Sequence, residues 1–132
     1  MQMTIYDLPV SPNGPKGLLR MHWRARSRYN AKWRTLVRCQ IPHPMTPPAG
    51  RQVVTISQVR KRSLDPDNLN ASCKPILDAL VHWGLIADDS PRDIVLRCYQ
   101  YMNQKFNATT ITIHPEGEKD YADNAETDRR GD

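Results

Sequence analysis

The sequence has no long apolar run and few cysteines. No segment approaches the roughly 18 consecutive apolar residues that span a bilayer, and the N-terminus lacks a basic start followed by an apolar block. The three cysteines, Cys39, Cys73 and Cys98, lie far apart and form none of the close pairs typical of zinc sites or redox motifs. We therefore expect buried, reduced thiols in a cytoplasmic protein that has no membrane partner.

Acidic residues are almost absent from the first half of the chain. Residues 1–62 contain twelve Lys or Arg and a single acid, Asp7. Residues 63–115 contain four bases and six acids, and residues 116–132 contain three bases and seven acids. This asymmetry is typical of a protein that holds a polyanion with one surface and concentrates carboxylates at one point. A charged face that only keeps the protein soluble explains the composition equally well.

The length and the hydrophobic content predict one folded unit. A chain of 132 residues with 39% hydrophobic residues can bury one ordinary core. We expect a single domain over residues 1–115. The polar, acidic segment 116–132 cannot bury enough apolar surface to order itself, so a disordered tail is expected there.

Hydrophobic periodicity predicts a small mixed β-sheet with two main helices, an α/β fold of the α+β class in the order β-α-β-α-β-β. A first helix is expected from Ser27, a candidate N-cap, to about residue 41, followed by a stiff, proline-rich loop over residues 42–50. Strands are expected at residues 3–10, 52–60, 94–102 and 109–113, the last two forming a hairpin across residues 103–108.

A second amphipathic helix is expected at about residues 69–83. Its apolar positions follow helical spacing, and Gly84 closes it. Pro75 leaves the start of this helix open by about a turn, because its ring clashes with the carbonyl of residue 71 in a straight helix. The apolar face comprises Leu69, Cys73, Ile76, Leu77, Leu80 and Val81.

Aspartates lie at both ends of this second helix. Asp65 and Asp67 follow the second strand, and Asp88 and Asp89 follow the helix after a short loop. Mg²⁺ prefers oxygen ligands and keeps several waters, so a few carboxylates and a substrate phosphate complete a site. The helix is about 22 Å long, so Asp89 reaches the first pair only if the chain folds back along it. Singly, each aspartate is also an ordinary cap or turn residue.

The basic stretch beside these carboxylates favours the metal interpretation. Arg60, Lys61 and Arg62 immediately precede the first aspartate pair. Clustered carboxylates repel a polyanion unless metal ions reverse the local sign of the charge. Metal-assisted hydrolysis of a phosphodiester explains the basic half and the carboxylates together.

Residues 60–90 resemble the RusA family of Holliday junction resolvases, with a looser resemblance over about residues 1–114. The shared pattern is a basic stretch, Asp65-Pro66-Asp67-Asn68-Leu69, a helix carrying Lys74 and Asp78-Ala79-Leu80, then Gly84 and Asp88-Asp89. The resemblance implies a small mixed α/β homodimer in which Asp65, Asp67 and Asp89 bind the metal and Lys74 assists catalysis. Asp88, Asn68 and Asn70 become neighbours of the ligands.

The spacing departs from the family pattern at one point. Between Asp67 and Lys74 the chain has close to one helical turn of extra sequence relative to the shortest family pattern, so the assisting position falls on Lys74 or on Asn70. An ordinary ion pair between Lys74 and Asp78 is the alternative role for this lysine.

The expected activity is the Mg²⁺-dependent resolution of four-way DNA junctions by paired phosphodiester hydrolysis in recombination and repair, with Mn²⁺ able to substitute, in a bacterial or phage-infected cell. Trp33 is expected in the core, whereas His22 and Trp23 are candidates for contacts with unpaired bases. A dimer that binds branched DNA without cutting, and a nuclease of forks, flaps or structured RNA, remain alternatives. The expected phosphate contacts are Arg24, Arg26, Arg28, Lys32, Arg34, Arg38, Arg60, Lys61 and Arg62.

Overall fold

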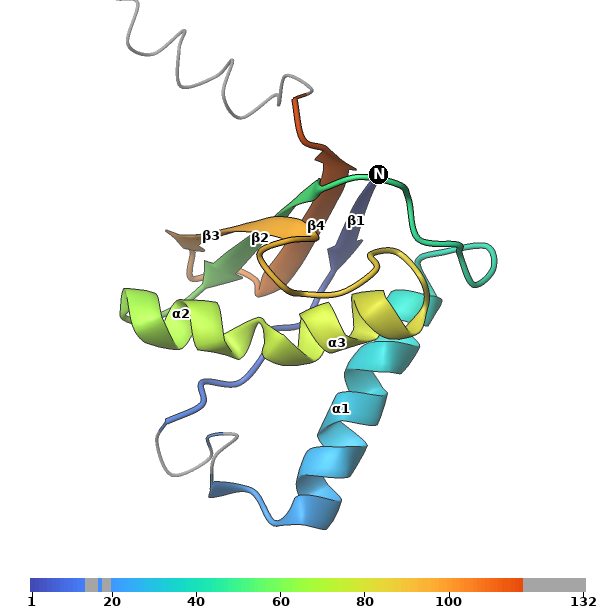
Figure 1. The fold of residues 1–132 in the computed structure, drawn as a ribbon. Helices are drawn as coiled ribbons and strands as arrows, with labels where there is room; N and C mark the ends of the chain where they lie inside the picture. Colours follow the sequence, from blue (N-terminus) through green and yellow to red (C-terminus); the bar gives the residue numbers. More distant parts are fainter. Residues whose placement is uncertain (14–16, 18–19, 118–132) are drawn as a thin grey trace, which may run out of the picture.

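A four-stranded sheet carries all the helices on one of its faces (Figure 1). The computed structural model describes residues 1–13, 17 and 20–117, so nearly all of the predicted tail lies outside the described residues. The predicted small mixed sheet of the α+β class is confirmed. The strands are β1 (Gln2–Ile5), β2 (Gln52–Arg60), β3 (Ile94–Met102) and β4 (Ala108–Pro115), and the helices are α1 (Trp23–Arg38), α2 (Pro66–Ser72) and α3 (Lys74–His82).

The most buried strand, β2, lies inside the sheet, whose strand order is β1-β4-β2-β3. Residues 52–56 of β2 are all buried, as expected of a β-branched run with a neighbouring strand on each side. β3 runs parallel to β2, whereas β4 runs antiparallel to both β2 and β1. A parallel pair needs a crossover connection, and α2 and α3 provide it.

The predicted hairpin between the last two strands is wrong. β3 and β4 do not pair with each other, because β2 lies between them and pairs with both. The intervening loop crosses the end of β2, where the Asn103 amide donates to the Arg60 carbonyl at 2.9 Å and the Gln104 side chain donates to the Lys61 carbonyl at 3.0 Å. A short loop suffices, since it spans only two interstrand spacings of about 4.8 Å each.

The first strand is shorter than predicted. β1 ends at Ile5, because its partner β4 begins at Ala108 and the last pair in the register is Ile5 with Thr109. The chain beyond Ile5 is held by side chains instead of a ladder. Thr109 donates to the Asp7 carbonyl at 2.7 Å, and the Val10 amide donates to the Tyr29 hydroxyl at 2.8 Å.

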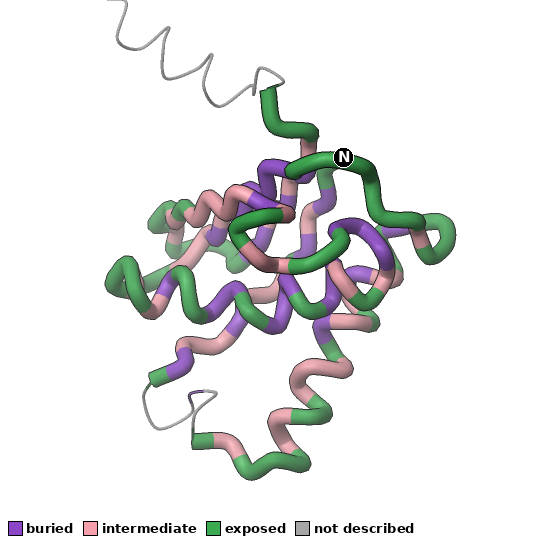
Figure 2. The backbone as a smooth tube through the Cα atoms, viewed as in Figure 1, coloured by how far each residue is buried: buried purple, intermediate pink, exposed green. Residues whose placement is uncertain are grey.

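Helix α1 begins about one turn before the predicted cap Ser27. His22 is the N-cap, and its ring Nδ1 accepts the Arg24 amide at 3.3 Å. Only Trp33 and Val37 of this helix are buried, both in its C-terminal half. The N-terminal half therefore projects from the body of the protein (Figure 2).

The second predicted helix is divided in two at Cys73. Pro75 has no amide hydrogen to give to the carbonyl of Ala71, and Cys73 ends α2 and precedes α3. The helix also starts earlier than predicted, because Asp65 caps it and Pro66 occupies its first turn. Both segments continue in nearly the same direction (Figure 1).

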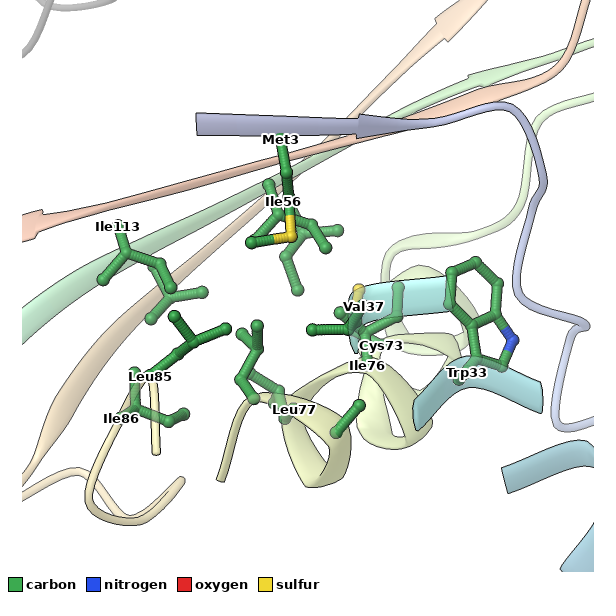
Figure 3. Packing of buried hydrophobic residues seen from close by; sticks show 14 of the residues in the cluster. Met3, Trp33, Val37, Ile56, Cys73, Ile76, Leu77, Leu85, Ile86 and Ile113 are labelled. Atoms are coloured by element: carbon green, nitrogen blue, oxygen red, sulfur yellow. The ribbon is translucent and has the colours of Figure 1, made fainter. Parts of the chain in front are cut away.

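The core lies between the sheet and the helices (Figure 3). Met3, Ile56 and Ile113 from the sheet meet Ile76 and Leu77 of α3. The prediction that Trp33 packs in the core is confirmed, since its side chain is fully buried. Within the described part of the chain, no helix is both long enough and apolar enough to cross a membrane.

A substitution at Gly84 tests how closely the chain is packed at the end of α3. Its φ of 76° lies in the left-handed region, and a Cβ there would overlap the carbonyl oxygen of Met45. Gly84→Ala should therefore lower the free energy of unfolding by more than about 2 kcal/mol, measured by chemical denaturation.

Gly50 is the matched control, because its φ is 80° and a Cβ there meets nothing within 4 Å. Gly50→Ala should cost only the backbone strain, about 1 kcal/mol. Equal losses for the two variants would show that the clash with Met45 is relieved by a small shift of the loop.

Candidate active site

Asp65 lies at the junction of the strand β2 and the helix α2. It is the N-cap of α2, and its carboxylate oxygens accept the Asn68 amide at 2.9 Å and the Asn68 side chain at 2.8 Å. The Asn68 side-chain oxygen in turn accepts from Asn13 at 2.6 Å. Asp65 therefore performs the capping role that its sequence position also allowed, while it stays exposed to solvent.

Asp67 is held differently from Asp65. It lies in the first turn of α2 and is exposed, where the helix dipole favours negative charge. It has no hydrogen bond or ion pair with any other residue that the structure describes. Its carboxylate is thus open to a ligand from solvent.

Asp89 returns to the helix at Lys74. The Lys74 ammonium lies 2.5 Å from Asp89 Oδ2 and 3.1 Å from Asp78 Oδ1. Because α3 leads away from Lys74 for two turns, the segment after α3 must reverse and run back along it, and the loop after α3 does so in Figure 1. The ordinary i,i+4 pair with Asp78 and the longer-range contact with Asp89 therefore occur together.

The contact between Lys74 and Asp89 stabilises both charges. The hydrogen bond from Lys74 is the main cause that holds the pKa of Asp89 below its ordinary value. The same bond, followed by the one to Asp78, raises the pKa of Lys74. The Asp89 side chain is only 26% exposed, whereas that of Lys74 is 57% exposed.

The exposed face of α2 and α3 is lined with charged groups. Lys74 and Asp78 lie four positions apart on one side of α3, and Asp67 lies seven positions before Lys74 on α2, which continues in nearly the same direction (Figure 1). Asp67 and Lys74 are separated by about 10 Å of helical rise. All three are exposed. Asp78 is a member of this face that the sequence analysis treated only as a partner of Lys74.

The chemistry of the donors fits a hard divalent cation, but the carboxylates are spread along the face and do not surround one point. The carboxylates at this face are oxygen donors of the kind that Mg²⁺ binds, and the ammonium between Asp78 and Asp89 marks a position that already favours a cation. In the described part of the chain, no three Asp, Glu, His or Cys side chains are grouped closely enough to hold a metal ion. Asp65 and Asp67 thus lie at one end of the charged face and Asp89 in its middle.

The residues predicted to lie beside the metal ligands, Asp88, Asn68 and Asn70, each have a different position and set of contacts. Asp88 is exposed, and its carboxylate accepts the backbone amide of Asp89 at 2.8 Å, which fixes the turn that presents Asp89. Asn68 supports Asp65. Asn70 is exposed on α2, and Lys74, not Asn70, contacts Asp89.

A buried polar network lies beneath the charged face. The Gln58 side chain donates to Ser72 at 3.0 Å and to Cys73 at 3.5 Å, and Cys73 lies 3.5 Å from the thiol of Cys98. The hydrogen bond with Cys98 is the main cause that lowers the pKa of Cys73 and also the one that raises the pKa of Cys98. This network joins the break between α2 and α3 to strands β2 and β3, so it fixes the position of Lys74, the next residue along the chain.

Several of the predicted phosphate-binding side chains serve the fold. Lys32 pairs with Asp7 at 2.7 Å, and Arg38 donates to the Ile41 carbonyl at 3.0 Å while its guanidinium lies over Trp83. Arg60 is half-buried and donates to the Pro9 carbonyl at 2.7 Å, and burial lowers its pKa. These groups are less available to DNA than the sequence suggested.

The remaining predicted basic residues fall into two groups. Arg24, Arg26, Arg28 and Arg34 belong to α1, and Arg24 and Arg28 are exposed on its projecting half. Lys61 and Arg62 are exposed at the end of β2, just before Asp65. Trp23 is 66% exposed, with the Arg24 guanidinium 5.1 Å from its ring centroid, so the first turn of α1 presents an aromatic ring and cations together.

No protein-family model and no curated protein matches this chain.

The pairing of Lys74 with Asp89 makes a prediction about titration. Because the pKa of Asp89 is depressed, its contribution to stability is present above the ordinary carboxyl pKa of 3.8 and is lost as the pH falls through the lower value in the folded protein. Lys74→Met should raise the pKa of Asp89, measured by NMR from the pH dependence of its carboxyl carbon shift. For this exposed pair, the loss of stability near neutral pH should be about 1 kcal/mol or less.

Lys32→Met is the control, since Lys32 pairs with Asp7 and not with Asp89. It should leave the titration of Asp89 unchanged. An Asp89 pKa that is the same in the wild type and in Lys74→Met would contradict the assigned contact.

Proposed function

We propose that this protein is a divalent-metal-dependent endonuclease that cleaves branched DNA, with four-way junctions as its main substrate. The observation that carries the proposal is the charged face of α2 and α3, where Asp89 pairs with Lys74 of α3, the helix that follows Asp67 of α2. The basic helix α1 and the resemblance of residues 60–90 to RusA resolvases support the same substrate.

The proposed ligands of Mg²⁺ or Mn²⁺ are Asp65, Asp67 and Asp89, with Asp78 as a further oxygen donor beside them. The bound ion supplies Lewis acidity and an activated water for hydrolysis of the phosphodiester. Asp65 presents its carboxylate at a rigid position, because Pro66 and the bonds from Asn68 fix it. Lys74 neutralises a phosphate that the ion holds beside Asp89, since its ammonium already lies beside that carboxylate.

We further propose that the protein acts as a homodimer. A four-way junction is close to two-fold symmetric, so a two-fold dimer presents two equivalent sites to opposing strands. Paired, symmetrical incisions follow from that arrangement. The exposed basic residues of α1, and Lys61 and Arg62 beside Asp65, would hold the DNA arms through their phosphates without reading sequence.

A second candidate function is the binding of branched DNA without cleavage. It is favoured by two observations: Asp65 is fully employed as a helix cap, and the described residues hold no preformed group of three metal ligands. On this alternative, the carboxylates are caps and ion-pair partners. Metal-dependent nicking separates the two functions.

Asp67→Asn is the sharpest test of the nuclease, because Asp67 forms no hydrogen bond or ion pair with the residues that the structure describes. The variant should lose cleavage of a synthetic mobile four-way junction at least about a hundredfold while it still binds the junction, since one ligand of the ion is lost and a negative charge facing DNA is removed. Cleavage is measured on labelled junctions with Mg²⁺ and with chelator, and binding is measured by gel shift in chelator.

Glu116→Gln is the matched control, since Glu116 is an exposed acid that pairs with Arg51 away from the charged face. It should cleave like the wild type. Undiminished cleavage by Asp67→Asn would remove Asp67 from the site, and a wild-type protein that binds junctions but never nicks them would favour the second candidate.

The basic half of α1 predicts a steep dependence of junction binding on salt. Each phosphate contact contributes about 0.9 to the slope of log K against log salt concentration. Arg24→Ala with Arg28→Ala should therefore reduce the slope by up to about 2, measured by fluorescence anisotropy in chelator. Arg51→Ala, which removes a cation already paired with Glu116, should leave the slope unchanged. A flat response in the wild type would exclude this surface as the main contact.

A further inference from the structure

Among residues 1–13, 17 and 20–117, all the helices pack on one face of the sheet, and no helix covers the other, which we call the uncovered face (Figure 1). On the edge strand β3, Cys98 contacts Cys73 and Gln100 bonds the backbone of Leu64, so both side chains point toward the helices. Successive residues of a strand point to opposite faces. Tyr99 and Tyr101 therefore point away from the helices, onto the uncovered face.

The side chains of these two tyrosines are exposed to solvent. Tyr99 is 39% exposed and Tyr101 is 59% exposed, although both belong to a regular strand. Their partners in the register of β2 are Ser57 and Val59, whose side chains are smaller. The two rings start about 6.7 Å apart along the strand, so each can stack on a separate planar group.

The strands beside the two tyrosines contain bases and no acid. Residues 52–64 and 94–115, which include β2, β3, β4 and the loop after β3, contain no Asp or Glu. The bond from Gln104 to the Lys61 carbonyl holds that loop, with exposed Lys105 and Phe106, against the end of β2. Arg60 bonds Gln58 and Pro9 on the helix side of the sheet, so the other cations of these segments are Lys61, Arg62, Arg97 and Lys105.

We propose that this uncovered sheet face binds single-stranded nucleic acid. Tyr99 and Tyr101 stack on two unpaired bases, and the cations of β3 and the loop after it, Arg97 and Lys105, hold the backbone phosphates. A second copy of the chain is a poorer occupant, because a two-fold contact through this face would place its cations against each other. The face lies on the opposite side of the sheet from α2 and α3, so it is a site separate from the charged face.

Tyr99→Thr with Tyr101→Thr tests the proposal, since threonine keeps the preference for strand structure but removes the rings. Binding of fluorescein-labelled oligothymidylate and oligouridylate is measured by anisotropy in chelator, so the result does not depend on cleavage. The double variant should bind at least about tenfold more weakly. Tyr99→Phe with Tyr101→Phe should bind nearly as well as the wild type, because stacking is retained.

Tyr6→Thr is the matched control, because Tyr6 is an exposed tyrosine that follows β1 at the far edge of the sheet. It should change affinity less than about twofold, a difference small beside that of a stacking contact. Circular dichroism and thermal unfolding verify that each variant is folded. Unchanged binding by the folded threonine double variant overturns the proposal, and so does a shift of its elution volume on sizing without a loss of affinity, which would identify the face as a contact between copies. The two oligonucleotides distinguish DNA from RNA as the preferred ligand.

Discussion

The parallel pairing of β2 with β3 is the constraint on which the rest of the structure depends. β2 is the most buried strand of the sheet, and the chain that leaves its end must return to the beginning of β3 before it can pair in the same direction. The crossover uses α2 and α3, so Asp65 at the start of α2 and the segment before β3 begin at opposite ends of the sheet. The reversal of the chain after Gly84 brings Asp89 part of the way back, as far as Lys74.

This geometry explains how the carboxylates are distributed. Asp65 and Asp67 are fixed by the end of β2 and the first turn of α2, whereas Asp89 is fixed through its bond to Lys74. The two groups share one exposed helical face, with about two turns of helix between them. In the proposed nuclease, the two groups act on one reaction only in the substrate complex, because a divalent ion and a phosphate together extend farther than an ion alone. Near neutral pH, the ammonium of Lys74 also reduces the electrostatic repulsion between these carboxylates.

The two faces of the protein offer different chemistry to a polyanion. The charged face of α2 and α3 mixes acids with a lysine, which is suited to a metal ion and to reaction at a phosphate. The uncovered sheet face has cations and aromatic rings without acids, which is suited to binding alone. The projecting half of α1 adds a third basic element, whose exposed Trp23 and Arg24 lie together. The branched DNA that we propose as substrate has duplex arms and, when it is partly unwound, single strands, so both kinds of surface fit the proposal.

Local chemistry in the sequence was enough to predict much of the fold. The β-branched runs gave the bounds of β2 and β3, and the apolar period gave the buried side of α2 and α3, because a strand or helix that must bury one face shows its period in the order of residues. Local capping was predicted less well. The imidazole of His22 caps α1 in place of the more usual Ser27, and Asp65 with Pro66 starts α2 a turn early.

Long-range pairing was decided only by tertiary structure. Whether β3 pairs with β4 or with β2 depends on which strand buries the most surface in the middle of the sheet. The local order of residues does not determine this. In contrast, the sequence alone identified the charged residues of the candidate site, which are Asp65, Asp67, Lys74 and Asp89. Only the path of the chain after Gly84 determined that Asp89 meets Lys74 first, because an ion pair forms between the groups that the packed backbone brings within reach.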